Sequence, residues 1–167
     1  GNTVTGSSVG ISLVGTANDV LADNTVTDAG TWAVTLEDGA SDVEITDLEL
    51  DGGRVVDLTG TDVGVRAASA AAPTPAGHAL VGGAVELAAT SGAGTVQQLA
   101  LSYDPDAVGS AEDRQPVVSV WHHDGSDWTR VGSPADWRYD AGNGDWYDTA
   151  VAGTAVDGDR HRVAAPV

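Results

Sequence analysis

The sequence contains no cysteine, methionine, phenylalanine or lysine. The lack of cysteine rules out a disulfide framework, so thiol content gives no information on the redox compartment. The lack of lysine leaves seven arginines as the only strong cations, against 25 acidic residues and a formal net charge of −18. Nucleic acid is excluded as a partner, because phosphate binding requires basic surface patches. The chain also has no apolar run long enough to span a bilayer.

The acidic residues are spread along the whole chain and are not gathered in a tail. This composition is typical of proteins adapted to molar salt, where counterions screen the repulsion between carboxylates over short distances. A dense acidic surface also keeps a protein hydrated and soluble. The alternative interpretation is an acidic surface protein from an organism that lives at low salt.

Residues 2–67 contain a repeat with a period of 20 to 24 residues. The recurring segments are Asn2-Thr3-Val4 with Asn24-Thr25-Val26, then Ile11-x-Leu13 with Val34-x-Leu36 and Val56-x-Leu58, and finally Asp19-Val20 with Asp42-Val43 and Asp62-Val63. Each period has three short segments in which apolar residues alternate, a pattern that predicts β-strands. A unit of this size cannot bury its own apolar face, so such repeats stack on one another.

Three coils of stacked strands are therefore expected, at Asn2–Asp23, Asn24–Asp47 and Leu48–Ala67. Equivalent strands lie above one another, so inward-facing residues should form columns along the stack. The expected columns are Val4/Val26/Leu50, Ile11/Val34/Val56, Leu13/Leu36/Leu58, Val20/Val43/Val63 and Ala22/Ile45/Val65. A helical interpretation fails because the segment is rich in Thr, Val, Gly and Asp, and no stripe with a helical period persists.

The rest of the chain divides into a linker and a second domain. Residues 68–77 are small side chains with two prolines, which cannot build a core and favour extended backbone. Residues 78–167 have the longer alternating segments of antiparallel strands, with turn signals at Asp124-Gly125-Ser126 and Asn143-Gly144. The expected strands are Ala79–Leu87, Val96–Tyr103, Val117–His123, Trp128–Val131, Trp146–Val151 and His161–Ala164, which together predict a small antiparallel β-sandwich.

The first domain resembles a known family of repeats. The residues that carry the resemblance are Gly10-Ile11-Ser12-Leu13, Asn18-Asp19-Val20 and Asn24-Thr25-Val26. They are similar to the repeats of right-handed parallel β-helix proteins, of the NosD-like, carbohydrate-binding and sugar-hydrolase type. The resemblance implies that this segment is the last three coils of such a β-helix. It also implies a ladder of stacked amide side chains at Asn2 and Asn24, which Leu48 ends.

The second domain resembles the Ig-like β-sandwiches found near the C-termini of archaeal and bacterial surface proteins. The matching segments are Leu101-Ser102-Tyr103-Asp104, Val120-Trp121 and Asp124-Gly125-Ser126-Asp127-Trp128-Thr129-Arg130-Val131. His161-Arg162-Val163 stands where that family has its closing aromatic pattern. The overall fold class expected is thus all-β, with parallel β-helix coils at 1–67 and an Ig-like sandwich at 78–167.

Two sets of oxygen-bearing side chains are candidate calcium ligands. Asp19, Asp42 and Asp62 fall in one expected column, and stacked strands lie about 4.8 Å apart, so the carboxylates would form an outward row. Such a row suits Ca²⁺ or the paired acids of a glycoside hydrolase, and a plain solvated acidic face is the alternative. Asp140, Asn143 and Asp145 form a second possible calcium loop, for which a tight hairpin turn is the alternative.

The aromatic residues of the second domain suggest a further site. Trp121 and Trp128 offer flat apolar faces on which a sugar ring can stack, and a role in the hydrophobic core is the alternative. Adjacent His122 and His123 should point to opposite faces of a strand, which argues against a shared zinc ion. We find no residue pattern that predicts a catalytic centre within this segment.

These features favour a structural or binding role outside a halophilic cell, as part of a surface protein, adhesin, filament or appendage. Two other classes stay open: the C-terminal part of a polysaccharide-active β-helix lyase or glycoside hydrolase, and a tail-spike-like receptor-binding protein of a halophilic virus. The expected partners are a polysaccharide or cell-surface glycan, and further coils of the same polypeptide or another subunit. The coils are expected because the first one leaves an uncovered strand edge at its N-terminal end.

Overall fold

The computed structural model describes residues 1–68, 73–108, 118–131, 137–140, 145–148, 155–157 and 162–165. In these residues the protein is all-β, as expected, apart from a short helix α1 (Pro105–Val108). The chain forms two compact units: Gly1–Ser69 with Gly83–Leu99, and Ala70–Gly82 with Ala100–Val167. None of the helices in the described ranges is long and apolar enough to cross a membrane.

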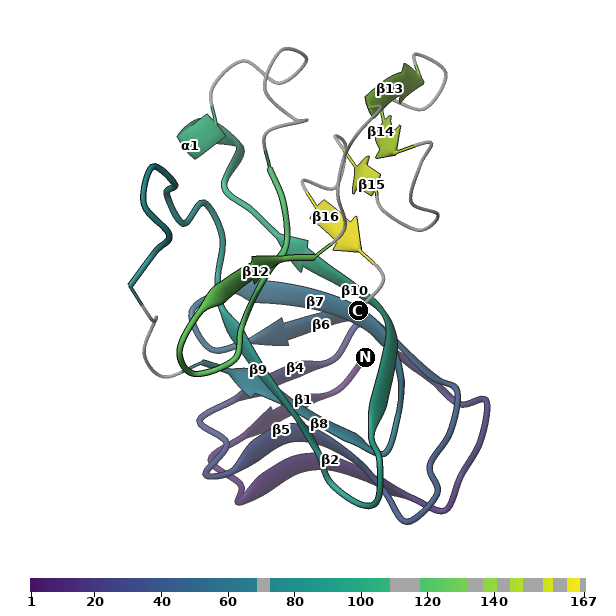
Figure 1. Ribbon diagram of the computed structural model, residues 1–167. Helices are drawn as coiled ribbons and strands as arrows, with labels where there is room; N and C mark the ends of the chain where they lie inside the picture. The colour runs from purple at the N-terminus through teal and green to yellow at the C-terminus, as the bar shows by residue number, and fades with distance from the viewer. Residues whose placement is uncertain are drawn as a thin grey trace. The chain divides into compact units, whose positions relative to one another are not determined.

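Parallel strand pairs organise the first unit (Figure 1). Its strands are β1 (Thr3–Thr5), β2 (Val9–Val14), β3 (Val20–Ala22), β4 (Thr25–Thr27), β5 (Trp32–Glu37), β6 (Val43–Leu50), β7 (Arg54–Thr61), β8 (Val63–Ala67), β9 (Val85–Ala89) and the start of β10 (Thr95–Ser102). β1 pairs with β4, β2 with β5, and β3 with β6, all parallel. Each strand of the first repeat, residues 2–23, thus lies beside the equivalent strand of the second repeat, residues 24–47.

The inward columns of the first two strand positions are confirmed between these repeats. Val4 pairs with Val26, which pairs with Leu50, and Ile11 and Leu13 pair with Val34 and Leu36. The four partners in the later repeats, Val26, Val34, Leu36 and Leu50, are at most 1% exposed. The side chains of the first repeat are only half-buried. The apolar core is therefore only partly covered at the first repeat, where its side chains meet solvent.

The two columns expected at the third strand position, Val20/Val43/Val63 and Ala22/Ile45/Val65, are wrong by one residue. Val20 and Ala22 were expected beside Val43 and Ile45, but the register pairs Leu21 with Ile45 and Val20 with Glu44. Val20 is 61% exposed as a result. The cause is the spacing of the preceding corner, because Ala17 pairs with Ser41, 24 residues later, and not 23 as in the neighbouring column.

The third coil is also wrong, because the chain reverses after β6. β7 pairs antiparallel with β6, which places Leu58 beside Ile45 and Val56 beside Leu48. β8 pairs antiparallel with β5, so Val65 lies beside Val34. The physical reason is the turn at Asp51-Gly52-Gly53, where two consecutive glycines have positive φ angles of 76° and 71°. This three-residue connection brings Leu50 opposite Arg54, and the Gly53 N–H donates to the Leu50 carbonyl at 3.1 Å, as in a tight hairpin.

Left-handed corners explain much of the aspartate content of this unit. Among its described residues, seven other than glycine have positive φ angles, namely Asn18, Asp23, Asp28, Asp38, Asp42, Asp47 and Asp62. Asn and Asp tolerate this conformation far better than other side chains, because they hydrogen-bond locally to the backbone. The corners between strands therefore require Gly, Asn or Asp, and most of them carry Asp here.

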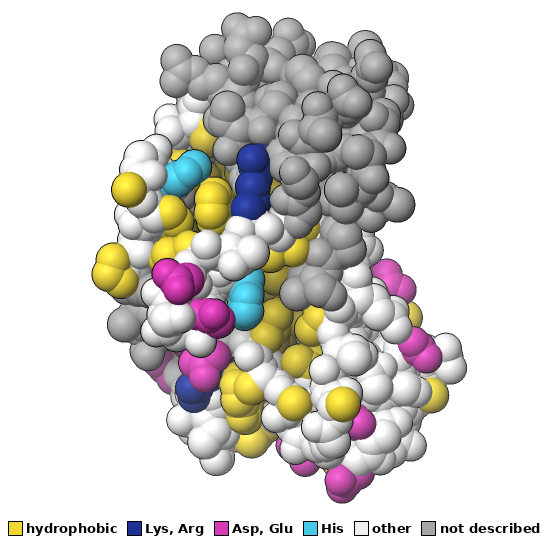
Figure 2. Space-filling view, viewed as in Figure 1, with side chains coloured by type: hydrophobic (Ala, Val, Ile, Leu, Met, Phe, Trp, Pro, Cys, Tyr) yellow, Lys and Arg dark blue, Asp and Glu magenta, His cyan; other side chains and the backbone are white. Residues whose placement is uncertain are grey.

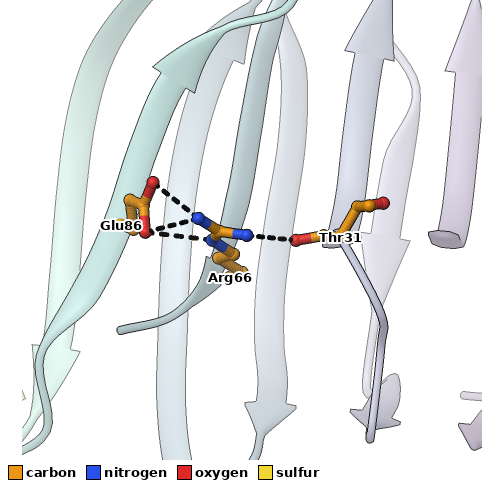
Figure 3. A network of polar contacts seen from close by, with 3 residues as sticks. All are labelled: Thr31, Arg66 and Glu86. Carbon is orange, nitrogen blue, oxygen red and sulfur yellow. Dashed lines mark hydrogen bonds and ion pairs between the residues drawn. The ribbon is translucent and has the colours of Figure 1, made fainter. Parts of the chain in front are cut away.

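One polar network lies on the sheet formed by β2, β5, β8 and β9 (Figure 3). Arg66 pairs directly across the strands with Glu86, and its Nη2 and Nε donate to the carboxylate at 2.8 and 3.0 Å. Its Nη1 donates to the Thr31 carbonyl at 3.0 Å, and the guanidinium lies 4.7 Å from the centre of the Trp32 ring. The ion pair is about two-fifths exposed, so water screens it and its contribution to stability is modest.

Thr35 gives a prediction about stability. The residue is 1% exposed, and its Oγ1 has no hydrogen-bond partner in the described structure. A buried hydroxyl without a partner costs about 1–3 kcal/mol of desolvation. We therefore expect Thr35→Val, which keeps the shape of the side chain, to raise the free energy of unfolding by about 1 kcal/mol. Urea unfolding at fixed salt measures this, and Thr35→Ser is the control that keeps the hydroxyl and should bring no gain.

Antiparallel pairs join most of the described strands of the second unit. These strands are the end of β10, β11 (Trp121–His123), β12 (Trp128–Arg130), β13 (Trp137–Asp140), β14 (Asp145–Asp148), β15 (Ala155–Asp157) and β16 (Arg162–Ala165). β11 and β12 form a hairpin, and β13, β14, β15 and β16 pair in chain order. This is consistent with the expected sandwich-like architecture, although β13 and β15 were not predicted from the sequence.

The division into units differs from the expected boundary at residue 78. Residues Gly83–Leu99 belong with the repeats, because β9 pairs antiparallel with β8 along its whole length. Just after β9, the Thr90 hydroxyl donates to the Leu36 carbonyl, and the Ser91 hydroxyl accepts from the Asp38 N–H. Both partners belong to the backbone of the second repeat. Of the expected linker at 68–77, residues 69–72 lie outside the described part of the chain.

Candidate functional site

The three aspartates of the expected calcium row do not share one column. The register of β3 and β6 places Asn18, and not Asp19, beside Asp42. Each carboxylate also has its own partner: Asp19 accepts from the Thr16 hydroxyl, Asp42 from Gln97 Nε2 at 2.9 Å, and Asp62 from the Gly39 N–H at 2.8 Å. Within the described ranges, no three His, Cys, Asp or Glu side chains gather as a metal site would require.

The second candidate calcium loop lies largely outside the described residues. Asp140 ends β13 and Asp145 begins β14, and the two residues pair across antiparallel strands. That pairing agrees with the alternative interpretation, a hairpin connection. Asn143 is not among the described residues, so calcium binding at this loop stays a prediction.

Trp121 and Trp128 lie on the same face of the β11–β12 hairpin. Trp121 pairs across the strands with Arg130, and His123 pairs with Trp128, so these four side chains share one face. His122 is exposed on the other face, as predicted from its position beside His123. We call this set, Trp121, His123, Trp128 and Arg130, the hairpin face.

Histidine rings pack against both tryptophans. The His123 and Trp128 rings are 4.8 Å apart, and the His78 and Trp121 rings are 4.7 Å apart, both tilted by more than 50°. Trp128 Nε1 donates to the Pro73 carbonyl at 2.6 Å, which fixes that ring, and both tryptophans stay half-buried. Sequence reasoning missed His78 because it lies far away in the chain. The alternation of Trp121-His122-His123 would have placed His123 on this face.

The turn of the hairpin is held by one carboxylate. Asp124 Oδ1 accepts hydrogen bonds from the Ser126 N–H, the Ser126 hydroxyl and the Asp127 N–H, at 2.9, 2.8 and 2.9 Å. Gly125 follows with a positive φ of 103°, which confirms the predicted turn. Backbone donors favour the ionised form, so these bonds hold the pKa of Asp124 well below its ordinary value.

The lowered pKa of Asp124 predicts an acid-resistant turn. A carboxylate with a depressed pKa stabilises the folded state above its unfolded pKa, and the effect is lost only as the pH falls through the folded value. The side-chain carboxyl ¹³C signal of Asp124 should thus keep its position on acidification through the ordinary Asp range. A carboxyl ¹³C NMR titration measures this, and the Asp124→Asn variant identifies the signal. Movement of the Asp124 carboxyl signal within that ordinary range would contradict the prediction.

On the side of the second repeat that faces away from the first, side-chain oxygens accept the hydrogen bonds of the corner N–H groups. Corner N–H groups of the first repeat donate to backbone carbonyls of the second: Gly6 to Thr27, Gly15 to Glu37, Asn18 to Ser41 and Asp23 to Thr46, at 3.0–3.2 Å. The equivalent N–H groups of the second repeat find side-chain oxygens instead: Asp28 donates to Asp51, Asp38 to Ser91, Asp42 to Thr61 and Asp47 to Asp57, at 2.6–3.2 Å. These side chains end the stack.

The opposite side of the first repeat is a strand edge. In a parallel pair, alternate residues direct their N–H and C=O groups to one neighbour and the intervening residues direct theirs the other way. Asn2, Gly6, Gly15, Asp19 and Asp23 bond to the second repeat. The groups that point away from it therefore belong to the intervening residues of β1, β2 and β3, namely Thr3, Thr5, Ser12, Val14, Val20 and Ala22. We call this edge the open end.

The predicted amide ladder is present next to the open end. Asn24 Oδ1 accepts hydrogen bonds from the N–H and the Nδ2 of Asn2, at 3.0 and 3.2 Å. Asn24 is 4% exposed, and its Nδ2 donates to the Ala22 carbonyl at 3.1 Å. The ladder ties the first repeat to the second at the start of each.

Comparisons of the chain with protein-family models, with curated proteins and with solved structures find no match. The features of this chain that bear on its function are the hairpin face, the open end and the acidic corners.

Proposed function

We propose that this chain is a structural and binding module of an extracellular or cell-surface protein of a halophile. In this proposal the repeats are coils of a right-handed parallel β-helix, and the second unit is an Ig-like sandwich. The observation that carries the proposal is the place of the aspartates. Asp28 and Asp47 occupy left-handed corners, and their N–H groups donate hydrogen bonds to the carboxylates of Asp51 and Asp57. Both sets of aspartates therefore stabilise the fold. Carboxylates engaged in this way support a scaffold more than a reaction.

The distribution of surface charge supports the proposal that the organism lives at high salt. On the face shown in Figure 2, acidic side chains occur at several separate places and do not form one patch. The corner aspartates Asp23, Asp28, Asp38 and Asp42 are exposed. A net charge of −18 repels itself at low ionic strength, and concentrated salt removes that cost.

Glycan binding at the hairpin face is a second candidate function. Its support is the position of Trp121 and Trp128 on one face of a hairpin, with Arg130 beside them. Aromatic faces stack on the apolar faces of sugar rings, and Arg supplies hydrogen-bond donors for carboxylate or sulfate groups of acidic glycans. Tryptophan fluorescence during titration with oligosaccharides tests this. Trp121→Ala should abolish the response, whereas Trp32→Phe, at a residue of the first unit, should leave it.

The surface location is tested with an antibody raised against the purified chain. The antibody should label intact cells of the source organism that are kept in their growth salt. The matched control is the same antibody on cells opened by osmotic shock, together with an antibody against a cytoplasmic enzyme. Labelling that appears only after the cells are opened would overturn the proposed location.

A further inference from the structure

The strongest feature that the proposed function leaves unexplained is the open end. Backbone N–H and C=O groups of Thr3, Thr5, Ser12, Val14, Val20 and Ala22 point away from the second repeat, and β1, β2 and β3 have no strand on that side within the described structure. Uncovered edges of this kind are templates for pairing with another strand. The apolar column ends there as well, because Val4, Ile11, Leu13 and Leu21 are only half-buried.

Resting on the proposed β-helix scaffold, we propose that the open end binds a further parallel β-coil with Gly, Asn or Asp at left-handed corners. The N–H groups of those corners donate to the carbonyls of Thr5, Val14 and Ala22. The partner is defined by this chemistry: three short parallel strands, isolated left-handed corners between them, and apolar side chains that cover the half-buried column.

The interface between the two repeats supplies the template. In the second repeat the carbonyls of Thr27, Glu37 and Thr46 accept hydrogen bonds from the corners at Gly6, Gly15 and Asp23. The equivalent carbonyls of the first repeat are those of Thr5, Val14 and Ala22, because the paired strands are in register. A parallel coil placed on the open end would repeat these bonds without any change in the first repeat.

The amide ladder points to the same partner. Asn24 Oδ1 accepts from the backbone N–H and side-chain amide of Asn2, one repeat earlier. Asn2 Oδ1 is the equivalent acceptor one step further, and an Asn at the start of the partner coil would donate to it. The exposed Val14 and Val20, at 58% and 61%, flank the same edge. Both the polar and the apolar groups of the open end thus match a coil of the repeat type.

A second copy of this chain fits the open end poorly. Two open ends can meet only about a two-fold axis, which would set the strands of the second copy antiparallel to β1, β2 and β3. The bonds between corner N–H groups and strand carbonyls that join the first repeat to the second belong to parallel pairs and could not be repeated in that arrangement. The other side of the stack is closed by the side chains of Asp51, Asp57 and Thr61, so a second copy cannot add there in the manner of a coil.

The test extends the full chain by one coil. Residues 2–23 are repeated ahead of Asn2, so that the new junction, Asp23 followed by Asn2, has the same residue types as the natural Asp23-Asn24. In the control extension, the added copy carries Gly6→Val, Gly15→Val and Asn18→Val, because valine cannot adopt the left-handed corner. Amide hydrogen exchange is measured on both extended chains and on the original one, in about 3 M KCl to screen the charge.

We expect the amides of Thr3, Thr5, Ser12 and Val20 to exchange at least about tenfold more slowly in the extended chain than in the control. The amide of Leu36 serves as an internal reference and should be equally slow in all three chains. Equal exchange rates in the extended chain and the control would overturn the proposal. A dimer of the original chain in sedimentation, with these amides already protected, would overturn it in favour of a second copy. The proposed cell-surface location is tested by antibody labelling alone, so the exchange results neither support it nor contradict it.

Discussion

Raising the KCl concentration from about 0.1 M to about 3 M is expected to increase the thermal midpoint by about 10 °C or more. The physical reason is the charge of −18 on 167 residues, which destabilises the compact state through self-repulsion when counterions are dilute. At high salt the screening length falls to a few Å, and the repulsion between corner carboxylates is largely removed. Circular dichroism melts at a series of salt concentrations measure the effect.

The control for this prediction is the identity of the cation. Screening is not specific, so NaCl and KCl should act alike at equal ionic strength. If the calcium ligands suggested by Asp140, Asn143 and Asp145 were real, millimolar CaCl₂ would raise the midpoint at constant ionic strength and a chelator would reverse it. A midpoint that does not change between low and high KCl would remove the argument for adaptation to salt.

Leu36→Asp is expected to lower the free energy of unfolding by about 4 kcal/mol or more, enough to unfold many domains of this size. Leu36 is 0% exposed, pairs with Leu13 in the stacked strands and lies in β5, an inner strand of its four-stranded sheet. An aspartate there would place an ionised group in the apolar core without a partner. Urea unfolding monitored by circular dichroism, in high salt, measures the loss.

The matched control is Ser12→Asp, which introduces the same charge one strand away. Ser12 is exposed, and it pairs with Thr35, the residue next to Leu36. The change should alter stability by no more than about 0.5 kcal/mol, as expected for an exposed site. Equal losses for the two variants would show that charge alone, and not burial, determines the result.

The first two repeats were predictable because alternation and period act together there. Val4, Ile11 and Leu13 recur as Val26, Val34 and Leu36 in sequence, and the structure pairs them. The amide ladder of Asn2 and Asn24 followed from the same period. Leu21 was missed, because a corner one residue longer moves the whole strand and reverses which residues face inward.

The reversal after β6 was hidden by the apolar pattern. Val56 and Leu58 have the alternation of a third coil, and alternation does not distinguish a parallel strand from an antiparallel one. The distinguishing signal was Asp51-Gly52-Gly53, whose two adjacent left-handed glycines turn the chain back. At the candidate sites, the position of Trp121 and Trp128 on one face of the hairpin could be read from the sequence. The contact of His78 with Trp121 depends on the tertiary fold and could not.

The left-handed corners also decide how the sequence can evolve. Each corner admits three residue types, Gly, Asn and Asp, and one of these brings a negative charge. A lineage that moves between fresh water and brine can therefore exchange Asn and Asp at Asp23, Asp28 or Asp38 by single substitutions, each of which alters net charge and leaves the backbone as it is. Exchange of Asn and Asp at the corners therefore lets the net charge change with the salinity of the habitat while the fold stays the same.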